Sequence, residues 1–219
     1  MIAPLGRHNP IHFRWLAPSL YIAFMLLPLL PVIYISFHST LRGSDLPVGT
    51  FTLSNYLHIA QNEDLVAAIF SSVSYVLFNI LITIPVALPA AYAFSRYSFV
   101  GDKHLFLGFL ALRMTPPVVM IFPVFQVFSA VGLINTPLAI ALAHCLFNIP
   151  IAIWVLEGFI SSIPREIDET AFIDGYSFPR FFMRKLIPLM APGIAVAAFF
   201  CFLFSWVEVV FARILTVTS

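Results

Sequence analysis

Long stretches without a charged residue alternate with short charged segments along the chain. Four uncharged runs of 27, 31, 43 and 22 residues occupy positions 15–41, 65–95, 114–156 and 186–207. A helix needs roughly 20 apolar residues to cross the hydrocarbon core of a bilayer, where backbone polar groups must be bonded internally. Each run is therefore long enough to span a membrane, and the 43-residue run is long enough for two spans.

The longest run contains a turn-forming segment at residues 131–137, Val-Gly-Leu-Ile-Asn-Thr-Pro. Dividing the run there, and extending its first half back to residue 105, predicts five membrane-spanning helices. They are expected at about 16–38, 68–94, 105–129, 137–157 and 189–211. Prolines inside the first two spans predict kinks, because neighbouring helices can satisfy the carbonyl groups that proline leaves unbonded. These prolines are Pro28, Pro31, Pro85 and Pro89.

Composition excludes the soluble classes of protein. Of 219 residues, 61% are apolar and only 10% are charged, against roughly 25% charged residues in a soluble domain. The net charge of +1 gives no footprint for a nucleic acid. The two cysteines, Cys145 and Cys201, both lie in apolar runs, so neither a disulfide framework nor a metal site is predicted. The sequence predicts an all-α integral membrane protein, a multi-span helix bundle.

Lysine and arginine are distributed unequally between the predicted loops. With the N-terminus in the cytoplasm, eight of the 11 basic residues lie on the cytoplasmic side, which is the orientation that the positive-inside rule favours. Arg113 falls about two turns into the third span, where we expect it to snorkel to the interface. The predicted organisation is a cytoplasmic segment at 1–14 and a membrane domain at 15–219, with an extracytoplasmic loop at about 39–64 and a cytoplasmic loop at about 158–188.

The cytoplasmic loop predicts two short helices joined by a sharp turn. Ser162 and Ser177 are expected to cap the two helices, and Gly175 to end the first with a positive φ. An apolar stripe at Ile163, Ile167 and Ala171 lies on the first helix, whose remaining surface is acidic. Because an anionic membrane surface repels acidic residues, a protein partner is the favoured cover for this stripe.

The same loop resembles the EAA loop of ABC importer permeases. Residues 163–175 read Ile-Pro-Arg-Glu-Ile-Asp-Glu-Thr-Ala-Phe-Ile-Asp-Gly, and residues 187–189 read Ile-Pro-Leu. The spacings from Glu169 to Gly175 and from Gly175 to Pro188 are those of the family pattern. Three positions depart from that pattern: Thr170 for Ala, Lys185 for Ile and Ile187 for Leu.

Other segments are similar to one branch of that family. Residues 131–136, 147–148, 153–159 and 204–208 resemble the carbohydrate-uptake permeases, of the maltose-permease-like kind. Residues 211–216, Phe-Ala-Arg-Ile-Leu-Thr, look more like the glycerol and polyol members. The resemblance implies the type I permease fold of ABC importers and a sugar, polyol or glycerol as solute. Because that family usually has six spans, we expect the sequence to be truncated before the sixth.

The resemblance also implies an assembly in a bacterial inner membrane. Its members would be a second permease subunit, two cytoplasmic ATP-binding subunits that hold ATP and Mg²⁺, and an extracytoplasmic solute-binding protein. This chain shows no nucleotide-binding loop and no catalytic or metal-binding motif, so it is predicted to be neither an enzyme nor the holder of a cofactor. The residues implied to couple it to the ATPase are Glu166, Glu169, Thr170, Ala171, Asp174, Gly175 and Pro188.

Five polar or aromatic residues within the predicted spans are candidates for a translocation path for a hydroxyl-rich solute. They are Gln126, His144, Asn148, Trp206 and Glu208. The alternatives are hydrogen bonds to a neighbouring helix, interfacial anchoring of the tryptophan, and, for Glu208, hydration or an ion pair with Arg213. Two rival functions stay open at this point: an ion-driven secondary transporter or channel, and an integral-membrane enzyme.

Overall fold

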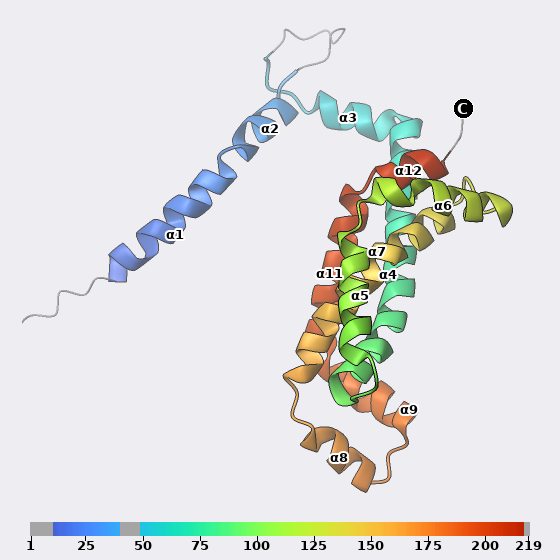
Figure 1. The fold of residues 1–219 in the computed structure, drawn as a ribbon. Coiled ribbons are helices and arrows are strands. Elements are labelled where there is room, and N and C mark those ends of the chain that lie inside the picture. The colour runs from blue at the N-terminus through green and yellow to red at the C-terminus, as the bar shows by residue number, and fades with distance from the viewer. Residues whose placement is uncertain (1–10, 40–48, 217–219) are drawn as a thin grey trace, which may run out of the picture. The chain divides into compact units, whose positions relative to one another are not determined.

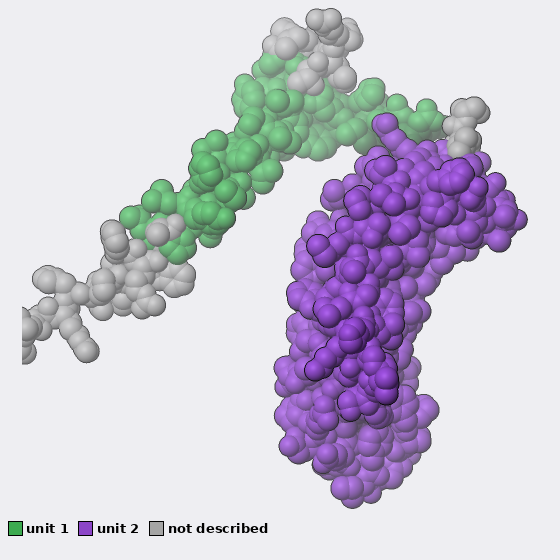
Figure 2. Space-filling view, in the orientation of Figure 1, with its two compact units in different colours: residues 1–68 green, residues 69–219 purple. Residues whose placement is uncertain are grey.

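The computed structural model describes residues 11–39 and 49–216. Backbone contacts divide the chain into two units, with the boundary after Ala68, and Figure 2 colours them separately. Among the described residues every regular element is helical, apart from one β-bridge between His38 and Phe51. The predicted all-α class is therefore confirmed.

Unit 1 contains α1 (Ile11–Leu26), α2 (Leu29–Ser36) and α3 (Ser54–Gln61). The axes of α1 and α2 differ by 44° across the break that contains Pro28, so the kink predicted at this proline is confirmed. Pro31 lies in the first turn of α2 and does not interrupt it, because the N–H that proline lacks has no helical partner in a first turn.

The longest helix, α4 (Glu63–Arg96), begins in unit 1 and continues through unit 2. Pro85 and Pro89 lie inside it without ending it, and the kinks expected at these two prolines stay predictions. Its buried residues recur at intervals of three and four, which places them on one face of the helix. They are Tyr75, Val76, Asn79, Thr83, Ala87, Leu88, Ala91, Tyr92 and Ser95.

The third predicted span is not one helix. It consists of α5 (Asp102–Met114) and α6 (Pro117–Ala130), whose axes differ by 96°. The expectation of a single helix at 105–129 is wrong because Thr115 precedes two consecutive prolines. A residue before proline is driven out of the helical region, and Pro117 then starts a new helix at its first position.

The fourth predicted span matches α7 (Pro137–Ser161), and the turn predicted before it is confirmed. Gly132 and Asn135 in this turn have φ values of 70° and 65°. Thr136 caps α7, since its side chain accepts a hydrogen bond from the backbone N–H of Ala139 at 3.2 Å.

Unit 2 is a bundle in which α7 packs against both α5 and α11 (Ala191–Val207), and α4 runs beside them (Figure 1). The short helix α12 (Val210–Leu215) packs on α6 and α7 at one end of this bundle. Small residues occupy the bundle core and let the helix backbones approach closely. The alanines in it include Ala87, Ala91, Ala152 and Ala197.

Among the described residues, two helices, α4 and α7, are by themselves long and apolar enough to cross a membrane. The number rises to five if each of three bent helix pairs counts as one span. The third such pair joins residues 178–189 to α11 at an angle of 75°. The five spans predicted from the sequence agree with this larger number under that way of counting, and the number of spans stays a prediction.

One close approach within the bundle gives a test of its packing. A methyl group added at Gly193 on α11 would lie 2.7 Å from Cγ of Phe159 on α7. We predict that Gly193→Ala lowers the free energy of unfolding by about 1–3 kcal/mol, the usual result of overpacking. The measurement is thermal unfolding of the purified protein in detergent. Gly108→Ala and Gly158→Ala are matched controls, since nothing lies within 4 Å of a methyl group at either position. Equal melting temperatures for all three variants would contradict the packing described here.

Candidate functional site

The loop that follows α7 forms a short helix, a tight turn and a second helical segment. The first helix is α8 (Glu166–Ile173), and the second segment comprises α9 (Phe178–Phe181), the π-helical η1 (Phe182–Leu186) and α10 (Ile187–Leu189). This arrangement confirms the two predicted helices. The π-helical turn contains Lys185, the residue that departs most from the family pattern.

Gly175 ends α8 in the conformation predicted for it, with a φ of 82°. Its backbone N–H donates to the carbonyl of Phe172 at 3.1 Å, and the N–H of Tyr176 donates to the carbonyl of Ala171 at 3.0 Å. These two bonds form a Schellman motif, which closes a helix with a residue in the left-handed region. The turn therefore depends on a residue that tolerates positive φ.

The cap predicted at Ser162 is wrong. Its hydroxyl donates to the carbonyl of Phe159 at 2.7 Å and so belongs to the end of α7. The next helix starts only at Glu166, and no side chain caps it. Ser177 does occupy the cap position of α9, but its side chain makes no capping bond.

The two faces of α8 differ in character. Asp168 and Ala171 are buried, whereas Ile173 is 85% exposed. Ile167, a residue of the apolar stripe that we expect a protein partner to cover, is also exposed. The exposed surface includes a shallow groove that carries two carboxylates and apolar side chains. Its lining residues are Glu166, Ile167, Thr170, Ala171, Asp174, Tyr176 and Lys185.

The groove gathers some of the predicted coupling residues but not all of them. Glu169 is exposed on α8 outside the groove, Gly175 forms the turn, and Pro188 lies farther along the chain in α10. The predicted coupling residues that line the groove are Glu166, Thr170, Ala171 and Asp174.

A buried ion pair connects α8 to α4, and no pattern in the sequence predicts it. Nε of Arg96 lies 2.7 Å from Oδ2 of Asp168, and the two side chains are 6% and 8% exposed. The hydroxyl of Tyr92 donates to the same oxygen at 3.0 Å. Asp168 lies in the first turn of α8, and its partner is 72 residues away in the sequence, so helical spacing does not reveal the pair.

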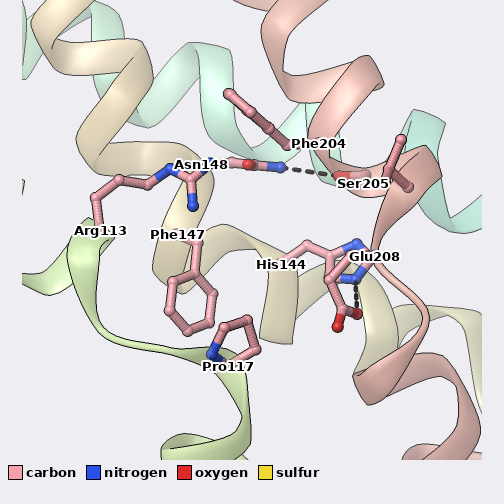
Figure 3. A pocket seen from close by; sticks show the side chains of 9 residues that line it. Arg113, Pro117, His144, Phe147, Asn148, Phe204, Ser205 and Glu208 are labelled. Atoms are coloured by element: carbon pink, nitrogen blue, oxygen red, sulfur yellow. Dashed lines mark hydrogen bonds and ion pairs between the residues drawn. The ribbon is translucent and has the colours of Figure 1, made fainter.

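The second candidate site is a cavity of about 210 Å³ within unit 2 (Figure 3). It lies where the break between α5 and α6 faces α7 and the end of α11. It is lined by Arg113, Pro117, His144, Phe147, Asn148, Phe204, Ser205, Val207 and Glu208. The cavity therefore combines charged, amide, hydroxyl and aromatic groups.

Three of the five predicted path residues, His144, Asn148 and Glu208, meet in this cavity. Gln126 is exposed on α6. Trp206 is 45% exposed and stacks on the ring of Phe202. The last two predicted residues are therefore not part of the cavity.

The carboxylate of Glu208 is held by three partners. Nε2 of His144 lies 3.0 Å from Oε2, and the backbone N–H groups of Val210 and Phe211 donate to the carboxylate at 2.8 and 3.1 Å. Glu208 thereby joins α7 to the start of α12. The alternative pairing with Arg213 is wrong, because the side chain that contacts the Glu208 carboxylate among the described residues is His144.

The side chain of Arg113 places a positive charge in the wall of this cavity. Its guanidinium lies 4.3 Å from the centre of the Phe204 ring, and no carboxylate in the described part of the chain pairs with it. Snorkelling to the interface, the expectation from the sequence, does not describe this side chain, which points into the cavity (Figure 3). The sequence showed that the residue lies within a span, but not which helices enclose it.

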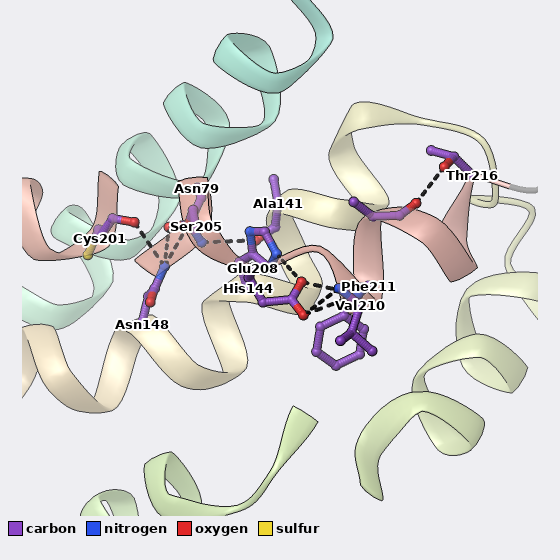
Figure 4. Close-up of polar contacts among 11 residues, drawn as sticks. Asn79, Ala141, His144, Asn148, Cys201, Ser205, Glu208, Val210, Phe211 and Thr216 are labelled. Carbon is purple, nitrogen blue, oxygen red and sulfur yellow. Dashed lines mark hydrogen bonds and ion pairs between the residues drawn. The ribbon is translucent and has the colours of Figure 1, made fainter. Parts of the chain in front are cut away.

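A buried polar cluster lies next to the cavity (Figure 4). The amide of Asn148 donates to Oδ1 of Asn79 at 2.7 Å and to the hydroxyl of Ser205 at 2.8 Å. The Asn79 amide in turn donates to the carbonyl of Ala141 at 3.0 Å. These bonds join α4, α7 and α11, so the alternative that Asn148 bonds neighbouring helices is confirmed.

Comparison with known proteins identifies the class of this chain. Residues 83–219 match the family model described as "Binding-protein-dependent transport system inner membrane component". The chain is 31% identical over 203 residues to the trehalose transport system permease protein SugB of Mycobacterium tuberculosis, a match that covers 92% of this chain and 74% of that protein.

Two further relatives are similar over most of the chain. The trehalose/maltose transport system permease protein MalG of Thermococcus litoralis is 29% identical, over 87% of this chain and 70% of the relative. The sulfoquinovosyl glycerol transport system permease protein SmoH of Agrobacterium fabrum is 27% identical, over 91% of this chain and 71% of the relative.

A solved structure shares the fold. It is the crystal structure of a bacterial ABC transporter involved in the import of the acidic polysaccharide alginate, with a TM-score of 0.68 and 20% sequence identity over 93% of this chain and 74% of the matched chain. The chain belongs to the family of binding-protein-dependent transport system inner membrane components. The resemblance to permeases of carbohydrate-type ABC importers is thus confirmed.

Proposed function

We propose that this chain is the membrane-spanning permease subunit of an ATP-driven importer for a small hydroxyl-rich solute, which a binding protein delivers. The observation that carries the proposal is α8. It is an exposed acidic helix that ends in the positive-φ turn of Gly175, and it carries the EAA-like sequence in a chain of the permease family. In this proposal α8 docks on the ATPase and moves with it.

A sugar, a polyol or glycerol is the solute class that we propose. The cavity supports it, because an amide, a hydroxyl, an imidazole and a guanidinium converge there beside aromatic rings. Hydroxyl-rich molecules are recognised by a few converging polar groups in an otherwise apolar pocket. The names of the relatives, which include trehalose, maltose and sulfoquinovosyl glycerol permeases, support the same class.

The proposed assembly contains a second permease subunit, two cytoplasmic ATP-binding subunits with ATP and Mg²⁺, and an extracytoplasmic binding protein. We place it in a bacterial inner membrane with the N-terminus of this chain in the cytoplasm. In that orientation the proposed topology is a cytoplasmic segment at 1–14 and a membrane domain at 15–219. The extracytoplasmic loop at about 39–64 lies partly outside the described residues, and the loop at about 158–188 faces the ATPase.

An ion-driven transporter is the rival function, and the pair of His144 and Glu208 is the feature that it would use. Membership of a binding-protein-dependent family favours the ATP-driven importer. Co-purification distinguishes the ATP-driven importer from the ion-driven transporter. The tagged chain, expressed with the other genes of its transport system and purified in detergent, should bring out an ATPase and a second permease. An ion-driven transporter should bring out neither.

The solute can be identified on the same complex. In proteoliposomes, ATP hydrolysis should rise when the binding protein is loaded with the correct compound. The compounds to screen are trehalose, maltose, glycerol, sorbitol and glycerol phosphates. A complex that hydrolyses ATP but responds to none of the sugars, polyols or glycerol would contradict the proposed solute class.

A charge change on α8 tests its proposed docking. Glu169 is exposed on this helix, and a carboxylate there can pair with a basic residue of the ATPase. We predict that Glu169→Lys lowers the amount of co-purified ATPase about tenfold, as expected when a charged contact becomes repulsive. Glu169→Gln should have a smaller effect. The matched control is Glu63→Lys, an exposed residue at the start of α4. Equal recovery of ATPase with all three variants would reject this docking surface.

The turn at Gly175 gives a second prediction. A Cβ atom added there would have no atom within 4 Å, so the φ of 82° is what opposes substitution. We predict that Gly175→Val reduces the number of solute molecules taken up per ATP hydrolysed, because a β-branched residue strains the left-handed turn by about 1–2 kcal/mol. Asn tolerates that region, so Gly175→Asn should retain most of the wild-type ratio. The ratio is measured in proteoliposomes, and an unchanged value for the valine variant would refute the assigned role.

The cavity gives a third prediction, on Arg113. Its guanidinium faces the cavity and pairs with no carboxylate in the described part of the chain, so its donors are free for a solute. We predict that Arg113→Gln lowers the rate of uptake about tenfold, the cost of losing a hydrogen bond to a charged donor. Arg113→Lys, which keeps the charge, should lose less. Arg213→Gln on α12, outside the cavity, is the control. Wild-type uptake by the glutamine variant would remove this residue from the solute path.

A further inference from the structure

The ion pair of Arg96 and Asp168 joins two parts of the protein that are far apart in sequence. Asp168 lies on the inner face of α8, and Arg96 is the last residue of α4. Oδ2 of the aspartate accepts both from Nε of Arg96 at 2.7 Å and from the hydroxyl of Tyr92 at 3.0 Å. Both charged side chains are almost completely buried. The cytoplasmic loop is therefore held to α4 by charged groups that solvent barely reaches.

Further bonds fix the geometry of this contact. Arg96 also donates to the carbonyl of Ile163 at 3.0 Å, and Arg165 donates to the carbonyl of Ser95 at 3.2 Å. Oδ1 of Asp168 is buried and has no hydrogen-bond partner among the described residues. The aspartate thus relies on Arg96 and Tyr92, and a displacement of α8 acts directly on the end of α4.

The helix α4 also takes part in the polar cluster beside the cavity. Asn79, on the same helix as Arg96, bonds Asn148 on α7 and Ser205 on α11. The latter two residues also line the cavity. Between Asn79 and Arg96 the helix is uninterrupted and about 25 Å long at 1.5 Å per residue. One continuous helix is therefore bonded at one end to α8 and, farther along, to the wall of the cavity.

We propose that Arg96 and Asp168 form the link through which movement of α8 displaces α4 and thereby opens or closes the cavity. The two residues are positioning residues: they touch neither the solute nor ATP. This inference rests on the proposed function and adds the route by which α8 acts. The helix α7 is joined to α8 by the chain between them, whereas α4 is joined to α8 by side-chain contacts. The ion pair therefore makes α4 move together with α8.

Stability alone is a poor explanation of such a pair. Burying two charges costs solvation energy, and proteins in which apolar residues of similar volume replace a buried ion pair are often as stable as the original. Removing only one charge leaves the other uncompensated, which destabilises a protein strongly. The informative variant is therefore the neutral double substitution Arg96→Gln/Asp168→Asn. It removes the ion pair between α4 and α8 without leaving a buried charge.

The experiment uses the whole complex in proteoliposomes. The quantity measured is the ratio of ATP hydrolysis with loaded binding protein to hydrolysis without it. The probe is whichever of trehalose, maltose, glycerol and sorbitol stimulates the wild type most. Co-purified ATPase is measured for every variant, and both single variants are included. Arg184→Gln and Asp102→Asn are the control substitutions, since neither residue forms an ion pair among those described.

We expect the double variant to bind as much ATPase as the wild type and to show a stimulation ratio about tenfold lower, a usual size for coupling between contacting residues. It should be no worse than the worse single variant, because the pair acts as one unit. The controls should keep the wild-type ratio. A double variant with wild-type stimulation would overturn the proposal. A double variant that fails to bind the ATPase would overturn it too, since the pair would then serve folding or docking. If the wild type itself binds no ATPase or shows no stimulation, the proposed function is what fails.

Discussion

The structure of unit 2 depends on the absence of water in the hydrocarbon core, which obliges buried polar groups to bond one another. The cluster of Asn79, Asn148 and Ser205 satisfies this requirement and in doing so fixes α4, α7 and α11 relative to one another. Apolar packing alone is a weak determinant of helix register in a membrane, because lipid tails compete for the same contacts. Small residues in the core then allow the close approach that these hydrogen bonds require.

Interruptions of the helices create the functional features of this bundle. The 96° break between α5 and α6 leaves room for a cavity, and the interruption after α11 at Glu208 supplies a carboxylate to its wall. Irregular backbone at membrane depth is tolerated where it lines a cavity. The two candidate sites therefore arise where prolines and turns end a helix. The helix α4 is not broken by its prolines, and it is bonded both to α8 and to residues of the cavity wall.

The predictions from sequence succeeded where the determinants are local. Helix positions follow from uninterrupted apolar runs, the turn before α7 from Gly132 and Thr136, and the end of α8 from Gly175. They failed where local signals compete. Ser162 has the chemistry of a helix cap but bonds backward to α7. The third span looked continuous in hydropathy although consecutive prolines divide it. The EAA-like spacing predicted the class of protein, because the spacing of residues within one loop can be read from the sequence without knowledge of the fold.

The sequence by itself determined that the chain is a helical membrane protein with an acidic loop of the permease kind, because charge-free length and residue spacing are properties of the chain alone. Only the tertiary structure decided which polar residues meet. His144, Asn148 and Glu208 share a cavity with Arg113, whereas Gln126 and Trp206 do not. The bond between Arg96 and Asp168 likewise joins residues 72 positions apart. Such contacts depend on how each helix is rotated and shifted against its neighbours, and the nearly uniform hydropathy of the spans does not reveal which residues then meet.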